Sequence, residues 1–281
     1  MDKKVLVTGA GGYIGRHVVT ALCDMEAHVV AVSSHTDGID PRAEVIARDI
    51  FSGSENIFRE LGSPDVCVHM AWRDGFKHNS DAHMDNLPKH YAFIRDMVAG
   101  GLKQLAVMGT MHEIGYHEGA VDENTPCNPI SMYGIAKDAL RRSTFLLLKD
   151  KDICLQWLRA YYIYGDDSKN SSIFSKLLQA AARGDEKFPF TSGKNLYDFI
   201  HVETLAKQIA ACAMQTEVEG IINCCSGEPV SLADMVERFI REHDLHITLE
   251  YGAFPDRPYD SPGIWGDSKK IQSVINKTVF N

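Results

Sequence analysis

Short runs of apolar residues alternate along the chain with longer segments in which apolar residues recur every three or four positions. The first pattern is typical of buried strands and the second of amphipathic helices. Their alternation predicts βαβ units and a parallel sheet. The runs predict strands at 5–8, 28–32, 45–47, 66–70, 105–108 and 154–158. The helical periods predict helices at 15–25, 56–61, 87–99 and 131–149.

The alternation loosens after about residue 164. Beyond it the pattern predicts helices at 173–183, 202–214 and 232–243, and a short strand at 221–224. The fold class is therefore α/β, a doubly wound parallel sheet with helices on both faces and a smaller C-terminal lobe. We expect one domain at 1–164, completed by strand and helix contributions from about 195–225, and a second lobe mainly at 165–281.

Composition and charge narrow the classes of partner. A formal net charge of −9 over 281 residues disfavours binding to nucleic acid, whose phosphates are also negative. No apolar stretch is long enough for a membrane span, and the apolar run at 5–7 is too short for a signal peptide. Seven cysteines without a C-x-x-C motif fit free thiols in a cytoplasmic protein, and the twelve histidines lack metal-ligand spacing.

A glycine-rich turn follows the first predicted strand and opens the first predicted helix, with the spacing G-x-x-G-x-x-G. Glycine permits a sharp turn and a close approach of the backbone to a pyrophosphate, which the free N–H groups of the helix then meet. The turn therefore predicts a dinucleotide site; a glycine-rich turn without ligand is the alternative that its position disfavours. The predicted contacts are Gly9, Gly11, Gly12, Tyr13, Ile14 and Gly15.

The end of the second strand bears on the choice between NAD and NADP. Enzymes that use NAD usually place Asp or Glu there, to accept a hydrogen bond from the ribose 2′-OH. Here the strand ends in Ser33, Ser34 and His35, without a carboxylate. These side chains, with Arg16, could accommodate a 2′-phosphate; the less favoured alternative is that the serines only form a turn. The sequence favours NADP over NAD.

A tyrosine and a lysine stand in a Y-x-x-x-K pattern, at Tyr133 and Lys137, so they share one face of the predicted helix. An ammonium group beside a phenol lowers the phenol pKa, which predicts a general acid/base usable near neutral pH. Thr110 ends the fifth strand at the carboxyl edge of the sheet, where α/β proteins bind ligands. Its hydroxyl is placed to hydrogen-bond a substrate carbonyl; a strand-end cap is the alternative.

With these parts the sequence resembles the extended short-chain dehydrogenases/reductases, in the branch of nucleotide-sugar epimerases, dehydratases and 4-ketoreductases. The segments that carry the resemblance are the glycine turn, His69-Met70-Ala71, 158–165, 198–202 and 226–231. The resemblance implies a Rossmann-type fold, an NAD(P) cofactor and Thr110, Tyr133 and Lys137 as catalytic residues. It implies further cofactor contacts at Asp49, Ile50, Met70, Ala71, Asn86, Tyr133, Lys137 and Tyr162, although Pro88 and His90 depart from the pattern around Asn86.

The residues after Thr110 separate the members of this family. Dehydratases carry an Asp-Glu pair there, whereas this chain has Met111 and His112, which argues against dehydration. His112 and Glu113 are expected to be polar residues at the edge of the cleft, with a shifted acid/base pair as the less favoured alternative. The missing strand-end carboxylate favours a 4-keto-6-deoxy sugar nucleotide reductase. A nucleotide-sugar epimerase, a reductase of another carbonyl, and a dinucleotide-binding sensor or scaffold without catalysis are the alternatives.

The substrate side is expected to contain Asn170, Ser171, Phe190 and Arg257, with the polar insert 72–85 bordering the sugar pocket. Arg257 suits a diphosphate through bidentate hydrogen bonds. Phe190 suits a base, or else anchors a loop. The resemblance also implies a homodimer formed by the helices that hold Asn86 and Tyr133. The apolar faces expected to permit it contain Phe93, Met97, Leu140 and Leu147.

Replacing Ser33 with Asp tests the interpretation of the strand end. The carboxylate would accept from the ribose 2′-OH and repel a 2′-phosphate, so the ratio of NADP to NAD utilisation should fall. Steady-state kinetics with both cofactors measures that ratio. An unchanged ratio would contradict the role given to this strand end.

Overall fold

The computed structural model describes residues 3–33, 36–165, 172–256 and 260–279 of the chain. Its centre is a seven-stranded sheet in which every neighbouring pair is parallel, in the order β11-β7-β5-β4-β1-β2-β3. The strands are β1 (Lys4–Thr8), β2 (His28–Val32), β3 (Glu44–Ile46), β4 (Val66–His69), β5 (Gln104–Thr110), β7 (Cys154–Ala160) and β11 (Gly220–Cys224). This is the predicted doubly wound, Rossmann-type arrangement.

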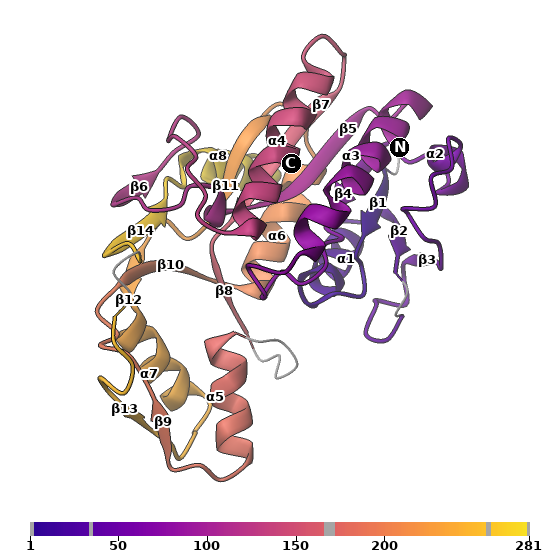
Figure 1. Ribbon diagram of the computed structural model, residues 1–281. Coiled ribbons are helices and arrows are strands. Elements are labelled where there is room, and N and C mark those ends of the chain that lie inside the picture. The colour runs from indigo at the N-terminus through magenta and orange to yellow at the C-terminus, as the bar shows by residue number, and fades with distance from the viewer. Residues whose placement is uncertain (1–2, 34–35, 166–171, 257–259, 280–281) are drawn as a thin grey trace.

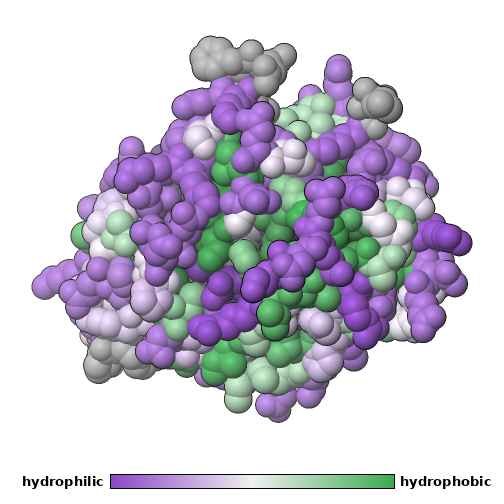
Figure 2. Space-filling view, turned by 90° about the horizontal axis from the view of Figure 1, so that it is seen from above, coloured by the Kyte–Doolittle hydropathy of each residue, from purple (hydrophilic) through white to green (hydrophobic). Residues whose placement is uncertain are grey.

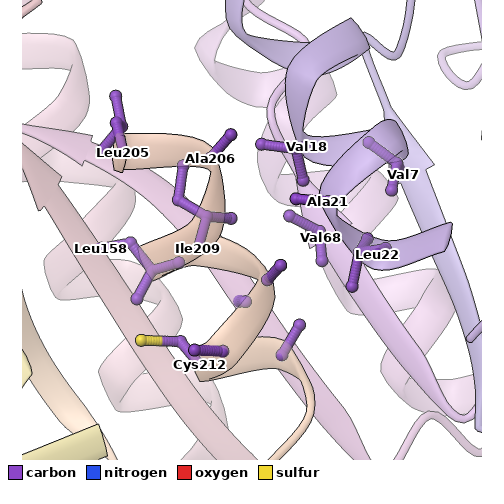
Figure 3. Close-up of a cluster of buried hydrophobic side chains, with 14 of the residues drawn as sticks. Val7, Val18, Ala21, Leu22, Val68, Leu158, Leu205, Ala206, Ile209 and Cys212 are labelled. Atoms are coloured by element: carbon purple, nitrogen blue, oxygen red, sulfur yellow. The ribbon is translucent and has the colours of Figure 1, made fainter. Parts of the chain in front are cut away.

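Helices cover both faces of this sheet (Figure 1). One face carries α1 (Tyr13–Asp24), α6 (Val202–Ala213) and α8 (Lys269–Val279), and the other carries α2 (Ile57–Glu60), α3 (Ala82–Gly100) and α4 (Met132–Leu148). The period of two in β1 divides its side chains between them: Val5 and Val7 pack with α1 and α6, whereas Leu6 packs with α3 and α4. In Figure 3, Ile209 of α6 and Val18 of α1 line the first of these two layers.

A second group of elements lies beside the sheet, at the lower left of Figure 1. Its five-stranded sheet has the order β12-β10-β14-β6, with β8 paired to β10, and a two-stranded sheet joins β13 to β9. The elements are β6 (Gly119–Val121), β8 (Tyr162–Tyr164), α5 (Ile173–Ala182), β9 (Lys187–Pro189), β10 (Leu196–His201), β12 (Pro229–Ser231), α7 (Leu232–Glu242), β13 (Thr248–Glu250) and β14 (Gly263–Gly266). A third apolar cluster fills this region.

The sequence pattern predicted none of these short strands, and it placed the start of helix α3 too late. The strand β6 pairs with β14 although the two lie far apart in the chain, so no local pattern marks the pairing. Helix α3 begins at Ala82 rather than at 87, so the end of the polar insert is helical. The division into a 1–164 domain and a 165–281 lobe stays a proposal, with β6 a segment of the first range that pairs within the second sheet.

Three of the four residues expected on a dimer face are buried in the core, and the fourth is partly buried. Phe93, Met97 and Leu140 are buried in the layer between α3, α4 and the sheet, and Leu147 packs against the same layer. Figure 2 shows hydrophobic residues gathered in the middle of one face of the molecule and bordered by hydrophilic ones. On α4 the strongly exposed apolar side chain is Leu146, at 76%. No helix in the described part of the chain is long and apolar enough to cross a membrane.

Candidate active site

The glycine turn joins β1 to α1 at the carboxyl edge of the large sheet. Gly9 has a φ of +69° and lies so close to the end of β4 that a Cβ atom on it would stand 2.8 Å from the backbone of Ala71. A Cβ on Gly15 would stand 2.1 Å from the carbonyl oxygen of Gly9. Both positions therefore need glycine, one for its backbone angle and both for the close approach of two chain segments.

The first turn of α1 suits an anion. Gly12 caps the helix without any side-chain hydrogen bond, and the first turn holds no acidic residue. The N–H groups at this helix terminus, together with the partial positive charge of the helix dipole, favour a pyrophosphate. Gly11, Tyr13 and Ile14 are partly buried in the same turn. The residues present thus fit a dinucleotide.

A buried hydroxyl fixes the turn to the neighbouring strand. Thr8 Oγ1 accepts hydrogen bonds from the backbone N–H groups of Met70 and Ala71, at 3.1 and 3.2 Å. It also bonds to His69 Nδ1 at 2.9 Å. The H-x-A segment predicted to line the cofactor is therefore held against the glycine turn by one threonine side chain, whose role the sequence did not indicate.

The predicted adenine end of the site lies beyond β3. Asp49 is exposed and accepts from the N–H of Phe51, while Ile50 is buried and lines a cavity of about 240 Å³ between α2 and α3. Asn86 lies on α3, where its amide donates to the carbonyl oxygen of Ala82. Ser33 follows β2 and is partly buried. Ser34 and His35 lie outside the described residues, so their contacts with cofactor stay predictions.

The three predicted catalytic residues meet at the end of β5. Thr110 is the last residue of that strand, and its side chain lies near enough to the Tyr133 phenol to lower the phenol pKa. Lys137 lies one turn further along α4 and is buried, with its Nζ 6.0 Å from the centre of the Tyr133 ring. The Lys137 ammonium donates to the carbonyl oxygen of Met108 at 2.6 Å.

The protonation of this pair differs from the expectation. Burial raises the pKa of Tyr133 to about 12, although the Thr110 side chain lowers it and the charge of Glu113 raises it further. Burial also lowers the pKa of Lys137 to about 7, with Glu113 opposing that shift. The expected lowering of the tyrosine pKa by lysine is therefore absent here, because burial penalises both charges. The phenol is protonated at neutral pH.

Aromatic and histidine side chains that were not predicted to contact Tyr133 surround its ring. The ring of His78 stacks on that of Tyr133, with centroids 5.6 Å apart, and its backbone oxygen accepts from the Tyr133 N–H at 2.8 Å. His83, His112 and Trp72 also contact the ring, with centroids within 6.1 Å. The insert 72–85 thus packs over the tyrosine, and the position of His78 next to the catalytic pair could be learned only from the fold.

Glu113 is not at the edge of the cleft, as the sequence analysis expected, but fully buried behind Thr110. Its carboxylate accepts from the Thr110 N–H at 2.8 Å and from the Trp157 indole at 2.9 Å. The guanidinium of Arg159, also fully buried, lies 3.4 Å away, and that of Arg141 lies 3.7 Å away. A Glu can be buried here because these donors and cations compensate its charge. It fixes the backbone that presents Thr110.

The predicted substrate contacts are only partly visible. Phe190 is 2% exposed and packs in the third apolar cluster against Tyr251, which corresponds to its anchoring alternative; contact with a base stays a prediction. Tyr162 of β8, which was predicted to contact the cofactor, lies partly exposed beside Tyr197, with ring centroids 4.2 Å apart, and its contact with cofactor stays a prediction. Asn170, Ser171 and Arg257 lie outside the described residues. Within the described residues, no cluster of histidine, cysteine and acidic side chains could hold a metal ion.

Comparison with known proteins agrees with this geometry. The model of the NAD dependent epimerase/dehydratase family matches residues 5–225, and the chain belongs to that family. The matched range contains the glycine turn, Thr110, Tyr133 and Lys137. The resemblance to the extended short-chain dehydrogenases/reductases is confirmed.

Individual relatives extend the match over nearly the whole chain. The chain is 45% identical over 269 residues to the dTDP-6-deoxy-L-talose 4-dehydrogenase (NAD(+)) of Aggregatibacter actinomycetemcomitans, covering 93% of this chain and 98% of that protein. A crystal structure of UDP-glucose 4-epimerase superimposes with a TM-score of 0.84 at 20% identity, over 99% of this chain and 92% of that one. The structure of MoeE5 in complex with UDP-glucuronic acid and NAD superimposes with a TM-score of 0.81 at 24% identity, over 97% of this chain and 92% of that one. These two structures confirm the fold.

Replacing Glu113 with Gln tests the buried support behind Thr110. The amide keeps the shape but removes the charge that faces the buried Arg159, so the free energy of unfolding should fall by about 3 to 5 kcal/mol. Urea denaturation measures it, and Glu55→Gln, at an exposed site, should change it by less than about 0.5 kcal/mol. Equal free energies of unfolding for the two variants would show that the Glu113 carboxylate does not stabilise the end of β5.

Proposed function

We propose that this protein is an NAD(P)-dependent oxidoreductase that interconverts a 4-keto group and an alcohol on a 6-deoxy sugar nucleotide. The observation that carries the proposal is the Tyr133 phenol, which is protonated at neutral pH and lies with Lys137 on α4 beside Thr110, at the ligand-binding edge of the sheet. A protonated phenol is the acid that reduction of a carbonyl requires. Support for the sugar nucleotide and for position 4 comes from the 45% identical relative, a 4-dehydrogenase of a dTDP-deoxysugar.

Each residue of the proposed site has a distinct task. The nicotinamide, when bound, supplies the hydride for reduction or accepts it in the reverse direction. Thr110 donates a hydrogen bond that orients the carbonyl oxygen, and Tyr133 gives that oxygen its proton as the carbonyl becomes an alcohol. Lys137 holds the cofactor ribose, and its charge offsets the phenolate left on Tyr133. In the direction of oxidation the same phenolate takes the proton back.

Two observations favour different cofactors. The strand end at Ser33 has no carboxylate, which favours NADP. The relative of 45% identity is named as an NAD(+) enzyme, and MoeE5 binds NAD. We propose NAD as the working cofactor, because a relative that matches over nearly the full chain outweighs the absence of one side chain. The Ser33→Asp experiment measures the same preference.

An epimerase is the second candidate. It is favoured by the fold likeness to UDP-glucose 4-epimerase, whose structure superimposes over 99% of this chain with a TM-score of 0.84. An epimerase oxidises and reduces the same sugar and so keeps its cofactor unchanged overall. The missing strand-end carboxylate, which would help to retain NAD through both steps, weighs against this candidate.

The stoichiometry of the cofactor separates the two. With dTDP-4-keto-6-deoxyhexose as substrate, we expect one NADH or NADPH to be consumed for each sugar nucleotide reduced, followed as the loss of absorbance of the reduced nicotinamide. Enzyme without added sugar nucleotide is the control. Conversion of one sugar nucleotide into its C4 epimer, with no net change in the cofactor, would favour the epimerase instead.

Replacing Tyr133 with Phe tests the proposed acid. The variant loses the transferable proton but keeps the ring that packs against His78, so turnover should fall at least about 100-fold while the cofactor still binds. Cofactor binding is measured as a rise in melting temperature. Tyr116→Phe, at an exposed position, is the matched control and should retain turnover. Normal turnover of Tyr133→Phe would contradict the mechanism.

A further inference from the structure

Trp72 lies directly against the buried cation of the proposed site. It follows the H-x-A segment at the end of β4, and Lys137 Nζ stands 3.9 Å from the centre of its ring. That distance is well inside the range of a cation–π contact, in which the negative face of an indole attracts an ammonium group. Nothing in the chain pattern links the two residues, which come from different elements of the fold.

The indole is held in its place by two histidines of α3. Its N–H donates to His83 Nδ1 at 3.0 Å, and His83 Nε2 bonds to the carbonyl oxygen of Lys77 at 2.9 Å. Because an indole N–H can only donate, His83 Nδ1 carries no proton, and the ring is the neutral Nε2–H tautomer. The ring of His90 stacks on the indole with centroids 4.4 Å apart and an interplanar angle of 18°. Trp72 therefore has little freedom to turn away.

Hydrogen bonds also fix the tautomers behind the indole. The oxygen of Thr8 already accepts two backbone N–H groups, so its hydroxyl donates to His69 Nδ1. His69 then bears its proton on Nε2 and donates it to His90 Nδ1 at 2.9 Å. Burial and the charge of Lys137 lower the pKa of both rings, His69 to about 3 and His90 to about 2. Both are neutral, so no second cation competes for the indole.

We propose that Trp72 is a positioning residue that keeps the Lys137 side chain in its ammonium form, through a cation–π contact that His83 and His90 hold in place. The proposal rests on the proposed function, in which Lys137 acts as a cation. Trp72 itself need not touch the reacting atoms. It acts through the lysine.

The other groups that face Lys137 do not replace this contact. Tyr133 is on the same helix and is neutral, and His69 of β4 and His90 of α3 are neutral. Glu113, from the 3-10 turn after β5, favours the ammonium form but makes its hydrogen bonds to the Thr110 N–H and the Trp157 indole. The Met108 carbonyl accepts one of the three ammonium protons. The indole face therefore joins the Glu113 carboxylate and the Met108 carbonyl in compensating the buried charge.

Removal of the Trp72 indole should shift the pH dependence of turnover to lower pH. Turnover requires the ammonium and is lost as pH rises through the Lys137 pKa, which burial has already lowered to about 7. Removal of the indole face disfavours the charged form further and lowers this pKa. The alkaline side of the plot of kcat against pH, called here the upper limb, must then move to lower pH. The phenol of Tyr133, whose pKa is about 12, stays protonated at these pH values.

The experiment measures kcat against pH from 5 to 10, with saturating cofactor and sugar nucleotide, for the full-length enzyme and two variants. Trp72→Met removes the aromatic face and should move the upper limb down by about one pH unit. Trp72→Phe keeps a weaker face and should move it by less. Trp265→Leu, which removes a partly buried tryptophan of β14, should leave the limb in place. An unshifted limb in Trp72→Met, with kcat lowered equally at all pH values, would overturn the proposal.

Two further variants keep the result decisive. If Trp72→Met does not fold, His83→Leu keeps the indole but removes its hydrogen-bond acceptor, together with the bond to Lys77 and the ring contact with Tyr133, and should give a smaller downward shift; an unshifted limb there would also count against the proposal. Lys137→Met separates this proposal from the function on which it rests. If Lys137→Met keeps full turnover, the proposed function fails. If it is inactive while the limb of Trp72→Met is unmoved, only the role of Trp72 fails.

Discussion

A buried ammonium group at the carboxyl edge of the parallel sheet constrains the groups around it. Burial disfavours the charge of Lys137, so its surroundings must compensate that charge. A backbone carbonyl, an indole face and a buried carboxylate do so, while the two histidines behind the indole stay neutral. The phenol of Tyr133 remains protonated in the same environment, which gives the proposed site an acid and a cation side by side.

The cofactor turn and the proposed catalytic residues belong to one connected edge. Thr8 fixes the segment after β4 against the glycine turn, and through His69 and His90 the same chain of contacts reaches the indole beside Lys137. On the other side, Glu113 fixes the end of β5 to β7 and α4. Because these links are buried and directional, the glycine turn and the lysine are held at a fixed distance from each other.

Parts of this arrangement could be predicted from the sequence. The strands of the large sheet are apolar runs and the helices between them are periodic, so both were found, whereas β6 and β14 are short and pair across a long stretch of chain. Thr110, Tyr133 and Lys137 were predicted from spacing and from family resemblance, and the structure brings them together. Glu113 was placed at the cleft edge because sequence does not tell a buried carboxylate from an exposed one. Phe93 and Leu140 were assigned to a dimer face but fill the core.

The sequence by itself determined the features that depend on neighbours in the chain. A glycine every third residue between a strand and a helix defines the turn, and a tyrosine and a lysine four residues apart share a helix face. Only the tertiary structure decided the protonation of that pair and the partners of the lysine. The energy of a charge depends on its burial and on the groups within a few ångströms, and Trp72, His90 and Glu113 reach Lys137 only when the chain has folded.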